Sequence, residues 1–317
     1  MLHLIRATYK YYKSLILRER GHTMDINYEL YKVFYHVAKT LSFSEASKEL
    51  YISQSAVSQS IKTLEKRLNQ ILFIRSTKKV QLTKEGLLLF KHIEPAVNLI
   101  TKGENQIAES NSLKGGQLRI GATDTICRYY LVPYLNQFHQ KYPNIHIKVM
   151  NQTSMGCVDL LENNQVDLII TNSPNTRLNT VGNVKALRTF SDVFIANRSA
   201  FPKLAEESVS LEQLLDYPIL MLESHATTSE FLHKLFLDNQ LDLVPSIEIS
   251  SNDLLIDLAK IGLGIAFVPD YCIQENEQDL IILNMTKTLP TRQLVAAFDN
   301  QIPLANAAEE FLQLLQA

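Results

Sequence analysis

The segment Ser44–Leu68, SEASKELYISQSAVSQSIKTLEKRL, constrains the fold of this chain more than any other. In its second half, apolar residues recur at steps of four, three and four, as Val57, Ile61, Leu64 and Leu68. This spacing places them on one stripe of a helix, which must pack against a core. Ser44 and Ser53 can cap two successive helices, and Tyr51-Ile52 can form the tight turn between them. The segment therefore predicts a helix, a turn and a second helix.

The opposite side of the second helical pattern carries hydrogen-bonding and cationic side chains, with Glu65 as its single acid. These side chains are Ser55, Ser58, Gln59, Lys62 and Lys66. An exposed helix face of this length normally mixes in more acids. Gln can pair bidentately with adenine, Ser can reach base edges or phosphates, and Lys neutralises phosphates. The pattern favours the recognition helix of a helix-turn-helix, with an ordinary surface helix as the alternative.

Two strand patterns, residues 72–75 and 79–82, follow this helix and flank the turn 76–78. They predict a β-ribbon wing with a basic tip. Formal charge points the same way, because residues 24–114 carry a net +4 and residues 115–317 a net −10, within a total of −2. A positive segment on an acidic body favours a polyanionic partner for that segment, although charge alone fits a solvated face equally well.

At this point the chain resembles the LysR-type transcription regulators. The resemblance rests on Phe34, Val37, and residues 42–44, 53–58, 64–65, 72–75 and 82–86. Ser47 and Asn69 stand where the family usually has Ala and Gly, and Asn tolerates the left-handed conformation that Gly would supply. By position, the resemblance implies base and phosphate contacts at Gln54, Ser55, Ser58 and Gln59, with Lys62 on the same face, and wing contacts at Arg75, Lys78 and Lys79.

The family pattern also suggests domain boundaries. It begins near Met24, so residues 1–23 are expected to be a non-structural N-terminal extension, followed by a winged helix-turn-helix over 24–82 and a linker helix with a hinge over 83–114. The linker repeats apolar residues at Phe90, Ile93, Val97, Ile100 and Ile107. This stripe fits either a seam between two helices or packing on its own domain. The resemblance favours the seam, and with it a dimer or tetramer.

Beyond Gly115-Gly116 the pattern changes to a β-α-β-α-β rhythm, starting with a strand over 117–121. Such a rhythm predicts a parallel α/β sheet. A second round extends to a strand over 265–268, so two small lobes are expected rather than one large sheet. We place the effector-binding domain at 115–317, with one lobe over about 115–187 plus 290–317 and the other over 188–289.

The resemblance implies a cleft between these lobes, as in periplasmic solute-binding proteins. Parallel strands end facing helix N-termini, where anions bind readily. The polar residues expected to bind the effector there are Thr123, Thr125, Thr153, Ser154, Asn172, Thr227 and Thr228. Taken singly, each of these residues is more often a plain helix cap, but as a set they surround the expected cleft. Asp124 would repel an anion unless it points away. The set predicts a small, polar, anionic effector.

Other functions lack the sequence features that they require. The chain has no P-loop, GxGxxG, nucleophile elbow or metal-ligand spacing, so no catalytic residue, metal or cofactor is expected. Cys127 lies near the expected cleft. A redox-sensing role is not expected for it, because Arg128 is its single basic neighbour that could activate the thiol. No apolar run approaches the ~20 residues of a membrane span. We expect a cytoplasmic regulator that binds double-stranded DNA, an effector, itself and RNA polymerase; the alternatives are a solute-binding component and an α/β enzyme.

Overall fold

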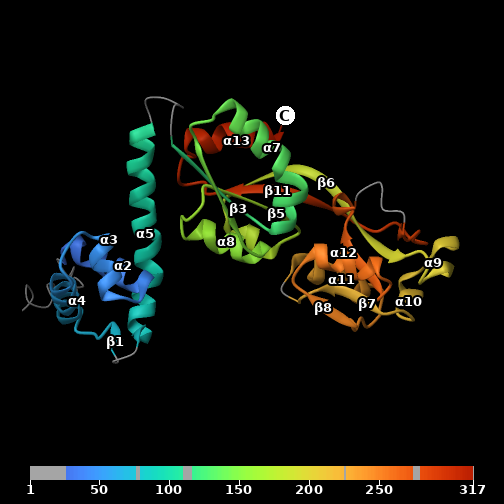
Figure 1. Cartoon of the computed structure of the whole chain (residues 1–317), viewed down its shortest axis with the longest axis horizontal. Helices are drawn as coiled ribbons and strands as arrows, with labels where there is room; N and C mark the ends of the chain where they lie inside the picture. The colour runs from blue at the N-terminus through green and yellow to red at the C-terminus, as the bar shows by residue number, and fades with distance from the viewer. Residues whose placement is uncertain (1–25, 76–78, 110–115, 225, 274–278, 317) are drawn as a thin grey trace, which may run out of the picture. The chain divides into compact units, whose positions relative to one another are not determined.

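The computed structural model describes residues 26–75, 79–109, 116–224, 226–273 and 279–316. The chain divides into two compact units, Met1–Ile100 and Thr101–Ala317 (Figure 1). The predicted extension over residues 1–23 lies outside the described residues. So do the predicted wing turn over 76–78 and the glycine at 115.

The described part of unit 1 holds short helices, a two-stranded ribbon and the start of a long helix. The elements are α2 (Tyr28–Thr40), α3 (Phe43–Glu49), α4 (Gln54–Leu68), β1 (Phe73–Arg75), β2 (Val80–Leu82) and α5 (Lys84–Glu109). The predicted apolar stripe of α4 supplies much of the core, since Val57, Ile61 and Leu64 are buried against α2 and α3. The two predicted strands pair antiparallel, with Ile74 opposite Gln81.

Capping explains where the two middle helices begin. Ser53 caps α4 as predicted, because its hydroxyl accepts a hydrogen bond from the Ala56 N–H at 3.2 Å. The prediction that Ser44 caps the preceding helix was wrong. That helix starts one residue before Ser44, and the Ser42 hydroxyl accepts from the Glu45 N–H instead. Asn69 ends α4 with a φ of 51°, which confirms that it takes the left-handed conformation.

The first part of the long helix α5 packs closely within unit 1. A Cβ atom on Gly86 would lie 2.1 Å from the carbonyl oxygen of Leu72, so only glycine fits there. Phe90 stacks on Tyr35 of α2, and Ile93 packs on the same core. The first part of the predicted seam therefore packs on its own domain, which was the alternative interpretation.

Unit 2 consists of two lobes joined by two strands, β6 (Asn183–Asn197) and β11 (Thr291–Phe298). We call lobe I the elements β3 (Gln117–Ala122), α6 (Asp124–Ile126), η1 (Cys127–Leu131), α7 (Val132–Lys141), β4 (His146–Asn151), α8 (Ser154–Glu162), β5 (Leu168–Ser173), η2 (Thr176–Thr180) and α13 (Asn306–Gln316). We call lobe II the elements α9 (Pro202–Glu206), α10 (Leu211–Leu214), β7 (Ile219–Leu222), α11 (Thr227–Asp238), β8 (Ile247–Ile249), α12 (Asn252–Lys260), β9 (Ile265–Pro269), η3 (Asp270–Cys272) and β10 (Leu280–Ile282).

The sheet departs from the expected pair of separate parallel sheets. Its hydrogen-bonded order is β4-β3-β5-β11-β6-β9-β7-β8, with β10 also paired to β6. The β3, β4 and β5 strands are parallel, as are β7, β8 and β9, whereas β6 and β11 run antiparallel to their neighbours. Because β6 pairs with β11 in its first part and with β9 in its second, one ladder of hydrogen bonds runs through both lobes.

Each lobe nevertheless has its own core. In lobe I, Leu168 and Ile170 of β5 face one cluster while Ile169 faces another, as alternation along a strand requires. Helices α7 and α13 cover the first face of this sheet, and α8 covers the second (Figure 1). Arg119 of β3 forms an ion pair of 2.7 Å with the buried carboxylate of Asp167, just before β5.

Candidate functional site

The polar face of α4 is the first candidate site. The helix turns its apolar stripe into the core, so the opposite side chains project from the surface. Gln54, Ser55, Gln59 and Lys62 are exposed and Ser58 is half-buried. All five residues predicted on this helix therefore lie on its outer side, within reach of a partner.

The single acid of α4 does not belong to this face. One carboxylate oxygen of Glu65 accepts hydrogen bonds from the backbone N–H groups of Leu72 and Phe73, at 2.9 and 3.3 Å. The charge is thus used to hold the start of β1 against the helix. The outer face keeps its donors and cations, which suits a polyanion.

The wing is only partly within the described residues. Arg75 ends β1, but its side chain lies outside the described part, and Lys78 lies outside it altogether. Lys79 is exposed just before β2. The antiparallel pairing of β1 and β2 places both ends of this basic segment at the same end of the ribbon.

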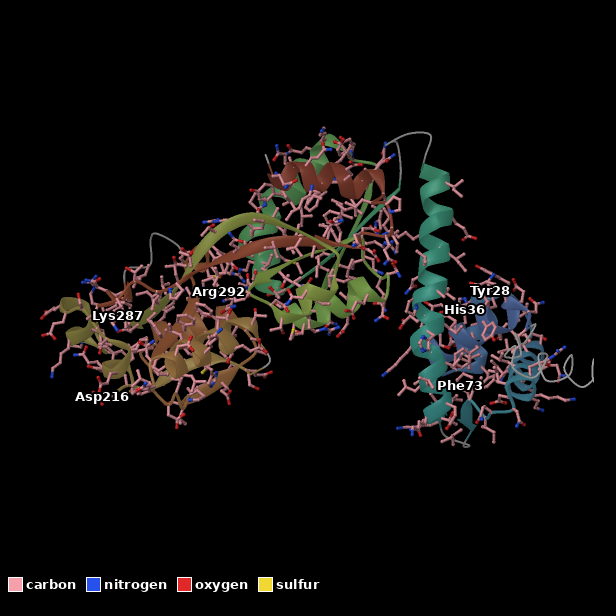
Figure 2. The ribbon with its side chains drawn as sticks, turned by 180° about the vertical axis from the view of Figure 1, so that it is seen from behind. Tyr28, His36, Phe73, Asp216, Lys287 and Arg292 are labelled. Carbon is pink, nitrogen blue, oxygen red and sulfur yellow. The ribbon has the colours of Figure 1, made fainter. Side chains whose placement is uncertain are left out.

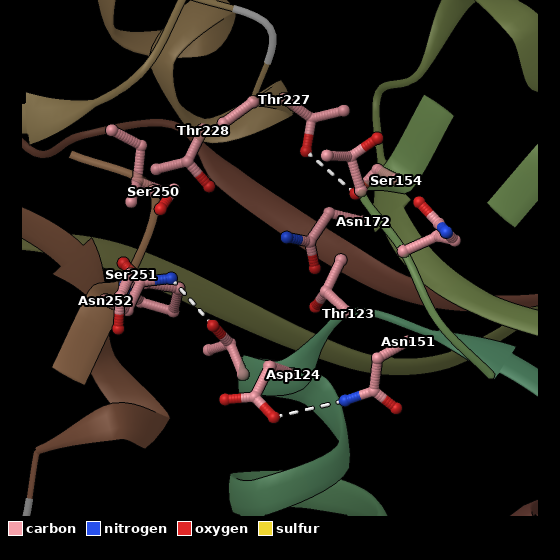
Figure 3. Close-up of a pocket in the computed structure, with 16 residues that line it drawn as sticks. Thr123, Asp124, Asn151, Ser154, Asn172, Thr227, Thr228, Ser250, Ser251 and Asn252 are labelled. Carbon is pink, nitrogen blue, oxygen red and sulfur yellow. Dashed lines mark hydrogen bonds between the residues drawn. The ribbon is translucent and has the colours of Figure 1, made fainter. Parts of the chain in front are cut away.

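The second candidate site is a cavity of about 300 Å³ between the two lobes of unit 2 (Figure 3). All seven residues predicted for the effector line it: Thr123, Thr125, Thr153, Ser154, Asn172, Thr227 and Thr228. They come from the ends of β3 and β5, the start of α8 and the start of α11. Residues that were selected because they lie at strand ends and helix starts thus come together from both lobes. Asn172, however, lies inside β5.

Several cavity hydroxyls accept hydrogen bonds from groups that can only donate. Thr123 and Thr153 are helix caps, accepting from the N–H groups of Ile126 and Gly156 at 3.3 and 3.1 Å. Thr125 accepts from the side-chain amide of Asn252 at 2.9 Å. A hydroxyl has one hydrogen of its own, which cannot point at such a donor. These hydroxyls are therefore set to donate elsewhere, and they line the cavity.

Residues on opposite lobes also touch one another around the cavity. The Ser154 and Thr227 hydroxyl oxygens lie 3.4 Å apart, and the amide of Asn252 reaches Thr125 (Figure 3). Beside the cavity, Asp253 at the start of α12 accepts from Tyr129, and pairs with Arg128 at 3.0 Å. These contacts link the two lobes around the cavity.

Charge is scarce at the cavity wall. Of the 16 lining residues drawn in Figure 3, Asp124 alone carries a formal charge. Its side chain is exposed and accepts a hydrogen bond from the Asn151 amide at 3.1 Å. Solvent and this amide reduce the repulsion that Asp124 would exert on an anion.

Cys127 stands next to this edge, with its sulfur 3.9 Å from Asn151 Oδ1. Burial, and then the nearby Asp124, raise the pKa of the Cys127 thiol to about 11. The thiol is therefore protonated at neutral pH, which opposes the reactivity that a redox sensor needs.

Behind the start of α11 lies Arg292, near the beginning of β11 (Figure 2). Its guanidinium is fully buried and pairs with Asp192 of β6 at 3.1 Å. It also donates to the hydroxyls of Thr228 and Thr227, at 3.0 and 3.3 Å. Burial raises the pKa of Asp192, against the lowering effect of Arg292.

The sequence analysis missed several residues of this site. Ser250, Ser251 and Asn252 line the cavity from lobe II. They follow β8 and lead into α12, and a position between a strand and the next helix was a usable signal, the same one that located Thr153 and Ser154. Arg292 had no such signal, because a single arginine in a strand pattern does not show what it faces.

Within the described residues, no group of three His, Cys, Asp or Glu side chains could hold a metal ion. The same residues contain no helix of the length and hydropathy needed to cross a membrane.

Comparisons with known proteins match both units. A family model described as "Bacterial regulatory helix-turn-helix protein, lysR family" matches residues 28–87, and one described as "LysR substrate binding domain" matches 111–317. The transcriptional activator CmpR of Synechocystis is 31% identical over 243 residues, which cover 77% of this chain and 79% of that protein. A probable RuBisCO transcriptional regulator of the same organism is 28% identical, covering 83% of this chain and 78% of that protein.

Solved structures agree on the fold. A full-length OxyR variant of Pseudomonas aeruginosa gives a TM-score of 0.71 at 19% identity, covering 92% of this chain and 94% of that one. Full-length CbnR in complex with its target DNA gives 0.64 at 16% identity, covering 92% and 99%. The family and the curated relatives are transcription regulators rather than enzymes. The chain therefore belongs to the LysR family, as a DNA-binding transcription regulator with a helix-turn-helix domain and an effector-binding domain.

Proposed function

We propose that this regulator senses a small, polar, anionic metabolite, bound in the cavity between lobes I and II. The observation that supports the proposal is the direction of the hydrogen bonds made by the cavity hydroxyls. Thr123, Thr125 and Thr153 each accept a hydrogen bond from an N–H group, which leaves their own hydrogens to donate. A wall of donors is complementary to a ligand made of acceptors, such as an oxyanion.

Helix starts add further donors. Thr227 and Thr228 occupy the first turn of α11, whose N-cap, Ala226, makes no side-chain capping bond. The first N–H groups of a helix lack partners within it, and the helix dipole favours negative charge there. The volume of about 300 Å³ is at the low end of ligand pockets, so a small metabolite fits best.

A thermal-shift and calorimetric screen tests the proposal. The panel contains sulfate, inorganic phosphate, small mono- and dicarboxylates, neutral sugars and small amines. We expect anions alone to raise the unfolding temperature. Stabilisation by the neutral sugars or the amines alone would contradict an anionic effector.

A matched pair of variants at Thr125 tests the site. Thr125→Val removes the hydroxyl and should weaken the anion found in the screen by about 0.5–3 kcal/mol. Thr125→Ser keeps the hydroxyl, including its bond from Asn252, and should bind as the parent does. Equal affinities in the two variants would place the anion elsewhere. DNA affinity without the anion should change little, because α4 lies in the other unit.

For DNA, we propose that Gln54, Ser55, Ser58 and Gln59 read base edges or phosphates, while Lys62, Arg75, Lys78 and Lys79 neutralise phosphates. The exposed face of α4 supports this division. We further expect a homodimer or tetramer, because Leu87 and Leu88 of α5 are 49% and 62% exposed. Light scattering that reports a monomer at micromolar concentration would contradict this. RNA polymerase as a partner and a cytoplasmic location stay predictions.

A further inference from the structure

We propose that Arg292 is the specificity-determining residue of the cavity, although it does not line it. From behind the wall it orients the hydroxyls of Thr227 and Thr228 so that they donate to the ligand, and it supplies the positive charge that selects an oxyanion. This inference rests on the proposed function, because it concerns the same cavity.

Contacts with a carboxylate, two hydroxyls and two aromatic rings restrict the position of the guanidinium. Its side chain is fully buried, with Asp192 at 3.1 Å. The rings of Phe190 and Phe231 also pack near it, with their centroids 5.4 and 4.9 Å from the guanidinium carbon. A planar cation packed against two aromatic rings has little freedom to turn. The directions of its N–H groups are therefore fixed by the fold.

These directions determine what the two threonines can do. Arginine has no acceptor, so the 3.0 and 3.3 Å contacts require the oxygens of Thr228 and Thr227 to accept. Their hydrogens must then point away from Arg292. Both residues line the cavity, where Thr227 lies within 3.4 Å of Ser154 across the lobes. The hydroxyl hydrogens of the α11 wall are thus directed away from Arg292 and can be donated to a ligand that accepts.

The charge of the wall depends on how well Asp192 offsets Arg292. Thr227 and Thr228 contact both the cavity and Arg292, whereas Asp192 contacts Arg292 and is not a lining residue. The second carboxylate oxygen of Asp192 has no hydrogen-bond partner among the described residues, and neither does the Arg292 Nε. Burial raises the pKa of Asp192, as does nearby Asp270, so the structure stabilises this carboxylate incompletely. Because Arg292 contacts two residues of the cavity wall and the Asp192 carboxylate contacts none that the structure gives, the positive charge acts more strongly on a bound ligand.

Two substitutions with opposite expected effects test the inference on the full chain. Asp192→Asn keeps an oxygen that can accept from Arg292 but removes the compensating charge. It should bind sulfate or inorganic phosphate more tightly, by about tenfold, because the cation is then unopposed in a poorly screened site. Arg292→Gln keeps donors but removes the charge, and should weaken the same anions by about tenfold or more. Calorimetry measures both affinities, and thermal unfolding without anion confirms that each variant is folded.

The opposite signs separate this role from a structural one. Simple damage to the buried pair would weaken binding in both variants. A folded Asp192→Asn that binds sulfate no more tightly, or a folded Arg292→Gln that binds it as the parent does, would overturn the inference. If Arg292→Gln does not fold, Thr228→Val takes its place with Thr228→Ser as control. Equal sulfate affinity in those two would also overturn it.

The same experiment distinguishes this inference from the proposed function. If none of the anions in the panel binds the parent protein, the anionic effector itself is contradicted. If the parent binds an anion while the variants at positions 192, 292 and 228 leave its affinity unchanged, Arg292 loses its role and the anion site stands.

Discussion

Five of the side chains proposed to read DNA lie within residues 54–62 of a single helix, whereas the seven proposed for the effector come from four separate segments of two lobes. In the first region, helical periodicity alone sets which side chains share a face. In the second, only the folded topology brings the segments together, and the polarity of the wall is set by groups behind it. A substitution on the helix face can thus alter a single contact with DNA. A substitution in the cavity also affects the buried groups that orient its wall.

Salt should produce the largest difference between the two regions. DNA affinity should fall by about a thousandfold between 50 and 200 mM salt, because neutralised phosphates release counterions. Sulfate affinity of the cavity should fall by less than about threefold, since buried interactions are screened less. Gel shifts and calorimetry in the same buffers measure both. A similar dependence of the two affinities on salt would contradict the proposed difference between the two regions.

A substitution at Gly86 should affect the first region alone. Gly86→Ala places a Cβ atom 2.1 Å from the Leu72 carbonyl oxygen and should destabilise unit 1 by about 1–3 kcal/mol. DNA affinity should drop while anion affinity stays. Gly103→Ala is the matched control in the same helix. A Cβ there meets nothing within 4 Å, so stability should be unchanged or slightly increased. Equal effects at the two glycines would contradict the close packing of α5 against the Leu72 backbone.

Within the DNA-binding unit, substitutions of a base contact and of a phosphate contact should affect specific and random DNA differently. Gln59→Ala should cost about 1–3 kcal/mol at specific sites and little on random DNA, because a base contact discriminates sequences. Lys79→Ala should weaken both kinds of site about equally and reduce the salt slope by about one. Binding titrations on the two DNAs decide this. The division of roles fails if both variants change the two affinities in the same proportion.

The smallest effect is expected at Cys127. With a pKa of about 11, its thiolate fraction at pH 7 is tiny and should rise about tenfold per pH unit until the pKa is reached. Alkylation of the full chain, followed by mass spectrometry, should show this slope, with Cys127→Ser as control. Anion affinity should be the same in that variant. Rapid alkylation at pH 7 would reopen a redox role.

The sequence predicted the fold well where local rules decide it. The stripe of α4, its Ser53 cap and the left-handed Asn69 follow from periodicity and backbone conformation. The cavity residues followed from strand ends and the family resemblance. The single ladder through both lobes was not foreseeable, because pairing of β6 with β11 joins strands about a hundred residues apart. For Phe90 the resemblance favoured a seam between helices, whereas its contact with Tyr35 shows that it packs on its own domain. Arg292 matters through Thr227 and Thr228, which local sequence does not link to it.

The path of β6 and β11 has a consequence for engineering. The chain leaves lobe I along β6 and returns along β11, where Ser191 lies opposite Thr291. Lobe II is therefore an insertion into what would otherwise be a β-hairpin, and each lobe has a core of its own. Replacing residues 192–290 with a tight turn would leave lobe I with Thr123, Thr125 and Thr153 on an open half-site. Such a truncated module would provide a scaffold onto which other second lobes, and with them other ligand preferences, could be grafted.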